Sequence, residues 1–176
     1  MESNPNKLYL IGSLRNAAVP ALAERVREKA PQFEVFDDWY SAGPEADDYW
    51  KTYEQAKHGT HAAGYVKALS GYAAEHVFQF DKHHLDTASH ALLVLPAGKS
   101  GHMEITYAAY GAGCETAILL EEGADPRWDV MYKFIPNILT SFDEVTEWLN
   151  KEKFVGSLYG EPVTAKRYQQ YLLKGI

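Results

Sequence analysis

Residues 91–107 read Ala91-Leu-Leu-Val-Leu-Pro-Ala-Gly-Lys-Ser-Gly-His-Met-Glu-Ile-Thr-Tyr107, and this stretch decides the fold. An apolar run enters a loop of small residues, and the chain resumes as a helix predicted to carry Glu104 in its first turn. Free backbone N–H groups and the helix dipole make such a junction an anion site. A carboxylate beside it is a candidate nucleophile or base. The alternative is an ordinary strand–loop–helix connection in which Glu104 only favours the helix start.

The rest of the chain continues this alternation. Apolar runs predict further strands at 7–11, 33–36, 116–120 and 138–139. Apolar residues at helical spacing predict helices at 19–29, 62–80, 104–112 and 141–149. The pattern is typical of an α/β fold, a parallel-sheet sandwich with helices on both faces, flavodoxin-like or Rossmann-like. We expect one domain over residues 1–176, with a core at about 7–150 and a tail at 151–176.

Two segments between the predicted strands are distinctive. Residues 45–60 are acidic and aromatic, without a clean period. The predicted helix at 62–80 carries an apolar stripe of Val66, Leu69, Ala73 and Val77. In parallel sheets ligands bind beyond the carboxyl ends of the strands, so the candidate ligand segments are 12–15, 37–40 and 97–104.

Composition excludes several classes of function. The 176 residues carry a net charge of −7 without a basic run, which argues against a nucleic-acid partner. The single cysteine, Cys114, has no partner for an internal disulfide, and we expect it to be a small core residue. Neither a signal-peptide pattern nor an apolar stretch of membrane-spanning length is present, so we expect a cytoplasmic protein without membrane contact.

Familiar cofactor motifs are incomplete. Gly12-Ser-Leu-Arg-Asn16 lacks the second and third glycines of a dinucleotide fingerprint, and Gly98-Lys-Ser100 lacks the earlier glycine of a Walker loop. The neighbours His83 and His84 point in different directions on any regular element. The spacing of His102 and Glu104 does not suit a zinc site. We therefore expect neither a metal nor another cofactor.

The order of motifs resembles a known family. Asp81-Lys-His-His-Leu85, then Ala88-Ser89, an apolar strand, a Gly/Ser loop, Met103-Glu-Ile-Thr-Tyr-Ala108, Gly111-Ala-Gly113 and a second apolar strand are similar to the core of the nucleoside 2-deoxyribosyltransferase superfamily. That superfamily includes nucleoside deoxyribosyltransferases and 5′-monophosphate N-glycosidases. Leu8-Tyr-Leu-Ile-Gly12 resembles its first strand, and the resemblance covers roughly residues 7–120. Thr106 stands where glycine is usual in the family.

The resemblance implies catalytic roles for three residues. Glu104 would attack C1′ of the sugar and hold it as a glycosyl ester, Asp81 would assist the leaving base, and Tyr9 would hydrogen-bond and orient Glu104. This chemistry requires a carboxylate against the positive charge that develops on the sugar, and a proton for the leaving base. The same arrangement serves transfer and hydrolysis.

One departure from the family pattern favours a phosphorylated substrate. The nucleoside-type transferases carry an acid six residues before the nucleophile, where this chain has Gly98. With Ser100, Gly101 and His102 behind it, we expect this loop to bind the 5′-phosphate of a deoxynucleoside monophosphate. The alternative is that Lys99 points into solvent and the loop binds nothing.

Substrate contacts are also expected from the other two ligand segments. The segment after the first strand offers Gly12, Ser13 and Arg15. The segment after the second strand offers Asp37, Asp38 and Trp39, with an aromatic ring to stack on a nucleobase and carboxylates to contact its amino edge. The alternative is that the aromatic side chains of this loop cover the core or a dimer contact.

Two other classes of function remain open. One is a non-catalytic nucleotide-binding or sensing domain, in which Glu104 would recognise a ribose hydroxyl. The other is a TIR-like NAD glycohydrolase, which also uses a glutamate near a ribose. We further expect a homodimer or larger homo-oligomer, since residues 40–53 and 154–173 carry more aromatic side chains than an exposed loop and tail should. The family resemblance also implies that a neighbouring subunit completes each site.

Overall fold

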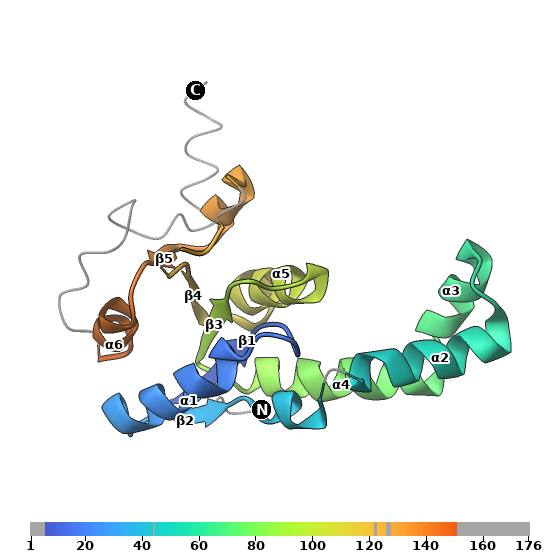
Figure 1. The fold of residues 1–176 in the computed structure, drawn as a ribbon, viewed down its shortest axis with the longest axis horizontal. Helices are drawn as coiled ribbons and strands as arrows, with labels where there is room; N and C mark the ends of the chain where they lie inside the picture. The colour runs from blue at the N-terminus through green and yellow to red at the C-terminus, as the bar shows by residue number, and fades with distance from the viewer. Residues whose placement is uncertain (1–5, 44, 122, 126–127, 151–176) are drawn as a thin grey trace.

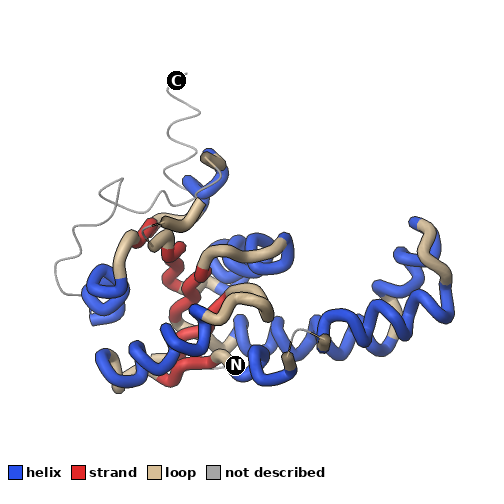
Figure 2. Tube along the Cα trace, viewed as in Figure 1, coloured by secondary structure: helices blue, strands red, loops and turns tan. Residues whose placement is uncertain are grey.

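The computed structural model describes residues 6–43, 45–121, 123–125 and 128–150, and the expected tail at 151–176 lies outside them. The described residues form a five-stranded parallel sheet flanked by helices (Figures 1 and 2). The strands are β1 (Lys7–Ile11), β2 (Glu34–Phe36), β3 (His90–Val94), β4 (Glu115–Leu119) and β5 (Asn137–Leu139). Their order is β2-β1-β3-β4-β5, which confirms the predicted flavodoxin-like α/β class. Each strand begins and ends within one residue of its prediction.

Helices connect these strands. They are α1 (Ala18–Lys29), α2 (Ala46–His58), α3 (Ala62–Leu69), α4 (Tyr72–Asp86), α5 (Lys99–Tyr107) and α6 (Phe142–Asn150). Short 3₁₀ helices cover Asp38–Ala42 (η1) and Val130–Phe134 (η3), and a π-helical turn, η2, covers Ala108–Ala112. Helix α6 is capped by a side chain, since the Ser141 hydroxyl accepts a hydrogen bond from the Glu144 N–H at 3.2 Å.

The side chains of each strand alternate between two apolar layers. One layer joins Leu8, Leu10 and Leu92 of the sheet to Val26 of α1 and Trp148 of α6. The opposite layer contains Tyr9, Ile11, Ala91 and Leu93 together with residues of α4 and α5. Tyr9 therefore points to the α4–α5 face, because strand side chains alternate with a period of two.

The region between β2 and β3 departs from the sequence predictions. Residues 46–58, for which no period was found, form the helix α2. The single helix predicted at 62–80 is wrong, because the chain turns at Ser70 and Gly71 and forms α3 and α4. Gly71 is needed at this turn, since a Cβ would overlap the carboxylate of Glu54. Together α2, α3 and the first half of α4 extend away from the sheet as a helical arm (Figure 1).

The stretch that follows β3 also differs in one respect. Helix α5 begins at Lys99, so Glu104 is its sixth residue and lies in the second turn instead of the first. The predicted ligand loop is correspondingly shorter, because Ser100, Gly101 and His102 belong to the helix. Gly101 faces the sheet and is buried against Ile11 and Leu93, a close approach that a larger side chain would push apart.

Candidate active site

Tyr9, Asp81 and Glu104 come together on the α4–α5 face of the sheet. They arrive from β1, from the last turns of α4 and from the second turn of α5. The Tyr9 hydroxyl donates a hydrogen bond to Asp81 Oδ1 at 3.3 Å, and its ring is almost fully buried. The resemblance implied that Tyr9 would hydrogen-bond Glu104, whereas the bond in the structure is to Asp81. Two carboxyl groups and a phenol thus form one cluster.

The surroundings of the cluster raise the pKa of each member. Burial raises the pKa of Asp81 from its ordinary 3.8 to about 6, although the hydrogen bond from Tyr9 acts in the opposite direction. Burial, and then the charge of Asp81, raise the pKa of Glu104 from 4.5 to about 7. Burial and both carboxylates raise the pKa of Tyr9, so its hydroxyl keeps its proton. Near neutral pH the two carboxyl groups therefore share about one proton.

An aromatic stack supports the α4 side of the cluster. The ring of Phe36 lies 5.1 Å from that of Tyr9 and stacks on His84 at 3.8 Å. Nδ1 of His84 lies 2.9 Å from Nζ of the buried Lys7, which donates, and burial and the charge of Lys7 lower the pKa of His84. The sequence analysis missed Phe36, Lys7 and His84, because only the strand pairing and the packing of α4 bring them together.

The start of α5 divides the residues predicted to bind phosphate. Gly98, Lys99 and Ser100 are exposed, and a Cβ on Gly98 would meet open space. His102 is engaged within the protein: Nδ1 lies 2.7 Å from the Gly98 carbonyl oxygen and Nε2 lies 3.1 Å from the Tyr132 hydroxyl. Tyr132, from η3, also stacks on His102. Its contribution was missed because η3 lies about thirty residues away in the chain.

The segment after β1 closes onto neighbouring elements. Gly12 is in close contact with α1, since a Cβ there would come within 2.7 Å of Val19. The Ser13 hydroxyl accepts a hydrogen bond from the backbone N–H of Arg15. The Arg15 guanidinium lies 3.6 Å from the carboxylate of Asp48 on α2, and both side chains are exposed. Arg15 thus reaches toward the arm, while Gly12 and Ser13 shape the turn.

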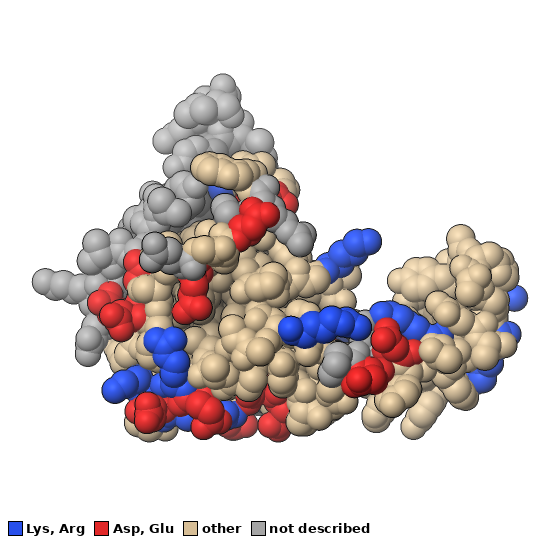
Figure 3. Space-filling model, viewed as in Figure 1, with Lys and Arg blue, Asp and Glu red and all other residues tan. Residues whose placement is uncertain are grey.

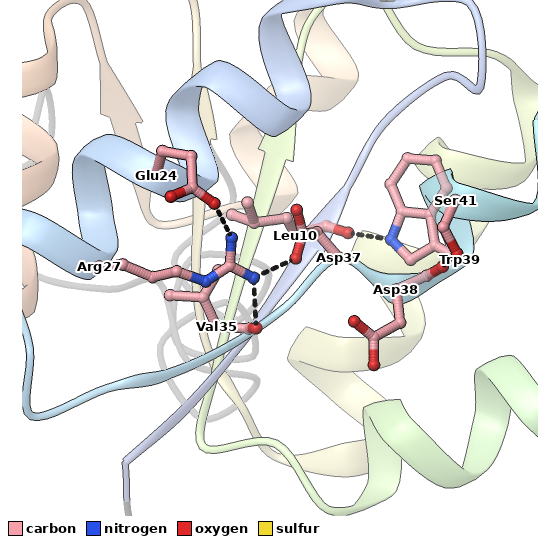
Figure 4. A network of polar contacts seen from close by, with 8 residues as sticks. All are labelled: Leu10, Glu24, Arg27, Val35, Asp37, Asp38, Trp39 and Ser41. Carbon is pink, nitrogen blue, oxygen red and sulfur yellow. Dashed lines mark hydrogen bonds and ion pairs between the residues drawn. The ribbon is translucent and has the colours of Figure 1, made fainter.

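The three candidates after β2 point in different directions (Figure 4). Asp37 forms an ion pair and hydrogen bond with Arg27 of α1, on the side of the sheet opposite Tyr9. The Trp39 indole N–H donates to the Leu10 carbonyl oxygen at 2.8 Å, and its ring packs against both apolar layers. Asp38 is exposed. Trp39 therefore packs on the core, as the alternative interpretation of the aromatic side chains stated, and Asp37 is paired with α1.

Other sequence expectations concern the rest of the described chain. Cys114 is buried with its thiol 3.3 Å from the Ala88 carbonyl oxygen, and burial raises its pKa to about 11. Among the described residues, no group of three or more His, Cys, Asp and Glu side chains forms a metal site. Within the same residues, no helix has both the length and the apolar character needed to cross a bilayer.

Comparisons with known proteins leave the family open. No protein-family model matches the chain. A search of curated proteins finds no significant match either. The likeness to nucleoside 2-deoxyribosyltransferases therefore rests on the residues of the chain itself.

Proposed function

We propose that this protein cleaves or transfers the N-glycosidic bond of a deoxynucleoside 5′-monophosphate or nucleoside, with Glu104 as the nucleophile. The carrying observation is the clustering of Glu104, Asp81 and Tyr9 with two raised carboxyl pKa values. Perturbed carboxyl groups held close together are typical of acid–base sites. The three residues come from distant parts of the chain, and the resemblance singles out the same three.

The proposed reaction has two steps. A carboxylate oxygen of Glu104 bonds to C1′ while the C1′–N bond breaks, and its electron pair leaves with the base, which takes a proton from Asp81. Water or a second base then attacks C1′ and gives a proton to the Asp81 carboxylate, the ester bond breaks, and the Glu104 carboxylate is restored. The reaction needs one proton on the carboxyl pair, which is the state expected near pH 6–7. No cofactor is required.

The proton distribution sets a condition on substrate binding. In the free protein the pKa values of both carboxyl groups are raised, so the pair as a whole holds about one proton near neutral pH. The nucleophile must be ionised, so this proton must reside on Asp81 when the substrate reacts. The positive charge that develops on the sugar favours this distribution, because it stabilises the Glu104 carboxylate.

A 5′-phosphate would bind at the start of α5. Exposed Lys99 and Ser100 lie there with open space beside Gly98. Gly101 and His102 contribute by fixing the first turn, since both are engaged in packing or hydrogen bonds. We expect monophosphates to exceed the matching nucleosides in kcat/KM by about 10- to 1000-fold. Ser100→Ala should narrow this gap by weakening only the phosphorylated substrate, and equal rates for both substrates would make the protein a nucleoside enzyme.

Incubation with each deoxynucleoside monophosphate, each nucleoside and NAD, followed by chromatography of the released base, tests the proposal. We expect base release from a deoxynucleotide or deoxynucleoside, and a loss of at least about 1000-fold in Glu104→Gln. Glu75→Gln is the matched control, because Glu75 is an exposed carboxylate on α4. Release from NAD alone would favour the glycohydrolase alternative. Binding without turnover would favour the sensing domain, and more than a tenth of the activity in Glu104→Ala would refute the nucleophile.

A nucleotide substrate fits a cytoplasmic location, which we also propose.

A further inference from the structure

The helical arm exposes an unusual number of apolar side chains. Six of them, on α3 and the first half of α4, are 43–81% exposed and are named here the arm patch: Tyr65, Val66, Leu69, Tyr72, Val77 and Phe78. Figure 3 shows the tip of the arm as a largely uncharged surface, with charged side chains at its outer edge and near its base. Lys67 is the one charged residue between Ala62 and Ala74.

The same residues follow the spacing of a buried helix face. Tyr65 and Leu69 are four residues apart and Val66 and Leu69 three apart, so the three share one side of α3. On α4, Val77 and Phe78 precede Asp81 by four and three residues, and Phe78 precedes the buried Leu85 by seven. The face of α4 that meets the sheet therefore continues outward as an uncovered apolar face. Periodicity placed Val66, Leu69 and Val77 along one apolar side of a single helix, and in the structure all three are exposed.

The arm holds this face in a fixed geometry. A Cβ on Gly64 of α3 would overlap the carbonyl oxygens that end α2, so the two helices are in direct contact. The Glu54 carboxylate is 1% exposed, lies against Gly71 at the start of α4, and is 3.4 Å from His58 Nε2. The exposure of the arm patch thus occurs on packed helices.

The size and chemistry of the arm patch indicate its partner. Half of its members are aromatic, and aromatic side chains present about 150–250 Å² each, so the exposed part of the patch is on the order of 600 Å². A standard interface takes about 800 Å² from each partner. An uncharged patch offers no complement to a strongly charged partner, whereas it complements itself about a two-fold axis.

We propose that the arm patch is the surface through which two copies of this chain associate. The two arms pack against each other, and Val77 and Phe78 place the partner within one helical turn of Asp81. The proposal does not rest on the glycosidic chemistry, since it follows from exposure, spacing and area.

Sedimentation of the whole chain at about 20 μM tests the proposal, with Val66→Glu as the variant and Val130→Glu as the matched control. Val66 and Val130 are 64% and 69% exposed, and only Val66 belongs to the arm patch. We expect wild type and Val130→Glu to sediment as dimers, and Val66→Glu as a monomer with a dissociation constant raised at least about 10-fold. Circular dichroism establishes that the fold is retained.

Three results would overturn the proposal. The first is a wild-type protein that is still monomeric at about 100 μM, a concentration on the order of the weakest useful self-association. The second is a Val66→Glu variant that remains dimeric. The third is equal dissociation of the Val66→Glu and Val130→Glu dimers. If Val66→Glu does not fold, Tyr72→Asp replaces it, because Tyr72 is 81% exposed. Glu104→Gln should remain dimeric, so loss of chemistry and loss of association are separate outcomes.

Discussion

The sheet and the arm use the same kind of helix in opposite ways. Helix α1 carries Val19, Leu22 and Val26 at helical spacing and buries all three against the sheet. Helix α3 carries Tyr65, Val66 and Leu69 at similar spacing and leaves all three exposed. An apolar stripe therefore indicates that a helix packs against a partner, but it does not indicate whether that partner belongs to the same chain.

The two regions also bury carboxylates in different settings. Asp81 and Glu104 lie together beside a phenol; burial raises the pKa of both, and the charge of Asp81 raises the pKa of Glu104 further. Glu54 lies alone in the arm and faces a histidine four residues later on the same helix. A buried carboxylate with a histidine partner supports packing, whereas two half-buried carboxyl groups that share a proton suit proton transfer.

Replacement of one carboxyl group by an amide in each region should give the largest difference, and the quantity compared is the catalytic rate. Asp81→Asn should lower base release by about 100- to 10 000-fold, the range for loss of a general acid, and more for poor leaving bases. Glu54→Gln, assayed where the protein is dimeric, should stay within about threefold of wild type, because Glu54 lies outside the cluster. The measurement is kcat/KM over bases of different basicity. Equal losses for all bases in Asp81→Asn would indicate a structural role.

A Leu→Ala substitution should cost about 3 kcal/mol more free energy of unfolding in the sheet than in the arm. Leu93→Ala, at a fully buried position of β3, should lower the free energy of unfolding by about 2–5 kcal/mol. Leu69→Ala, at a position 48% exposed on α3, should lower it by less than about 0.5 kcal/mol in dilute protein. Urea unfolding at two protein concentrations measures both. The Leu69→Ala effect should increase with concentration if the dimer forms through the arm.

Glu104→Gln should stabilise the protein at alkaline pH. The folded state raises the pKa of Glu104 to about 7, so it retains a proton that the unfolded chain releases above pH 4.5. The free energy of unfolding therefore falls as the pH rises from about 4.5 to 7. Above about pH 7 Glu104 is ionised in the folded state as well, and this loss of stability stays constant. The glutamine variant should be more stable by about 1–3 kcal/mol at pH 8 and nearly equal to wild type at pH 4. Thermal unfolding at both pH values tests this, and an equal difference at pH 4 and pH 8 would contradict the raised pKa.

Helix caps provide the smallest contrast. Ser141→Ala removes the hydroxyl that accepts from the Glu144 N–H before α6 and should cost about 1 kcal/mol. His61→Ala, at the N-cap of α3, should cost only a few tenths of a kcal/mol, because His61 makes no side-chain cap bond. Urea midpoints decide this, and a larger loss in His61→Ala would show that the arm is stabilised through its caps.

The sequence by itself determined the sheet. Short apolar runs between helical patterns located all five strands to within a residue, because a buried parallel strand must be apolar on both faces. The helical patterns likewise identified α1 and α6. The sequence also selected Glu104, Asp81 and Tyr9, although only through the order of motifs.

The tertiary structure decided what surrounds those elements. The break at Gly71 depends on Glu54, seventeen residues earlier, and no local pattern of 62–80 contains that information. The pairing of Tyr9 with Asp81 needs β1 and α4 side by side, and the diversion of Asp37 to Arg27 needs α1 on the opposite face. Periodicity records which side chains prefer to leave water, whereas long-range packing decides which of them find a partner within the same chain.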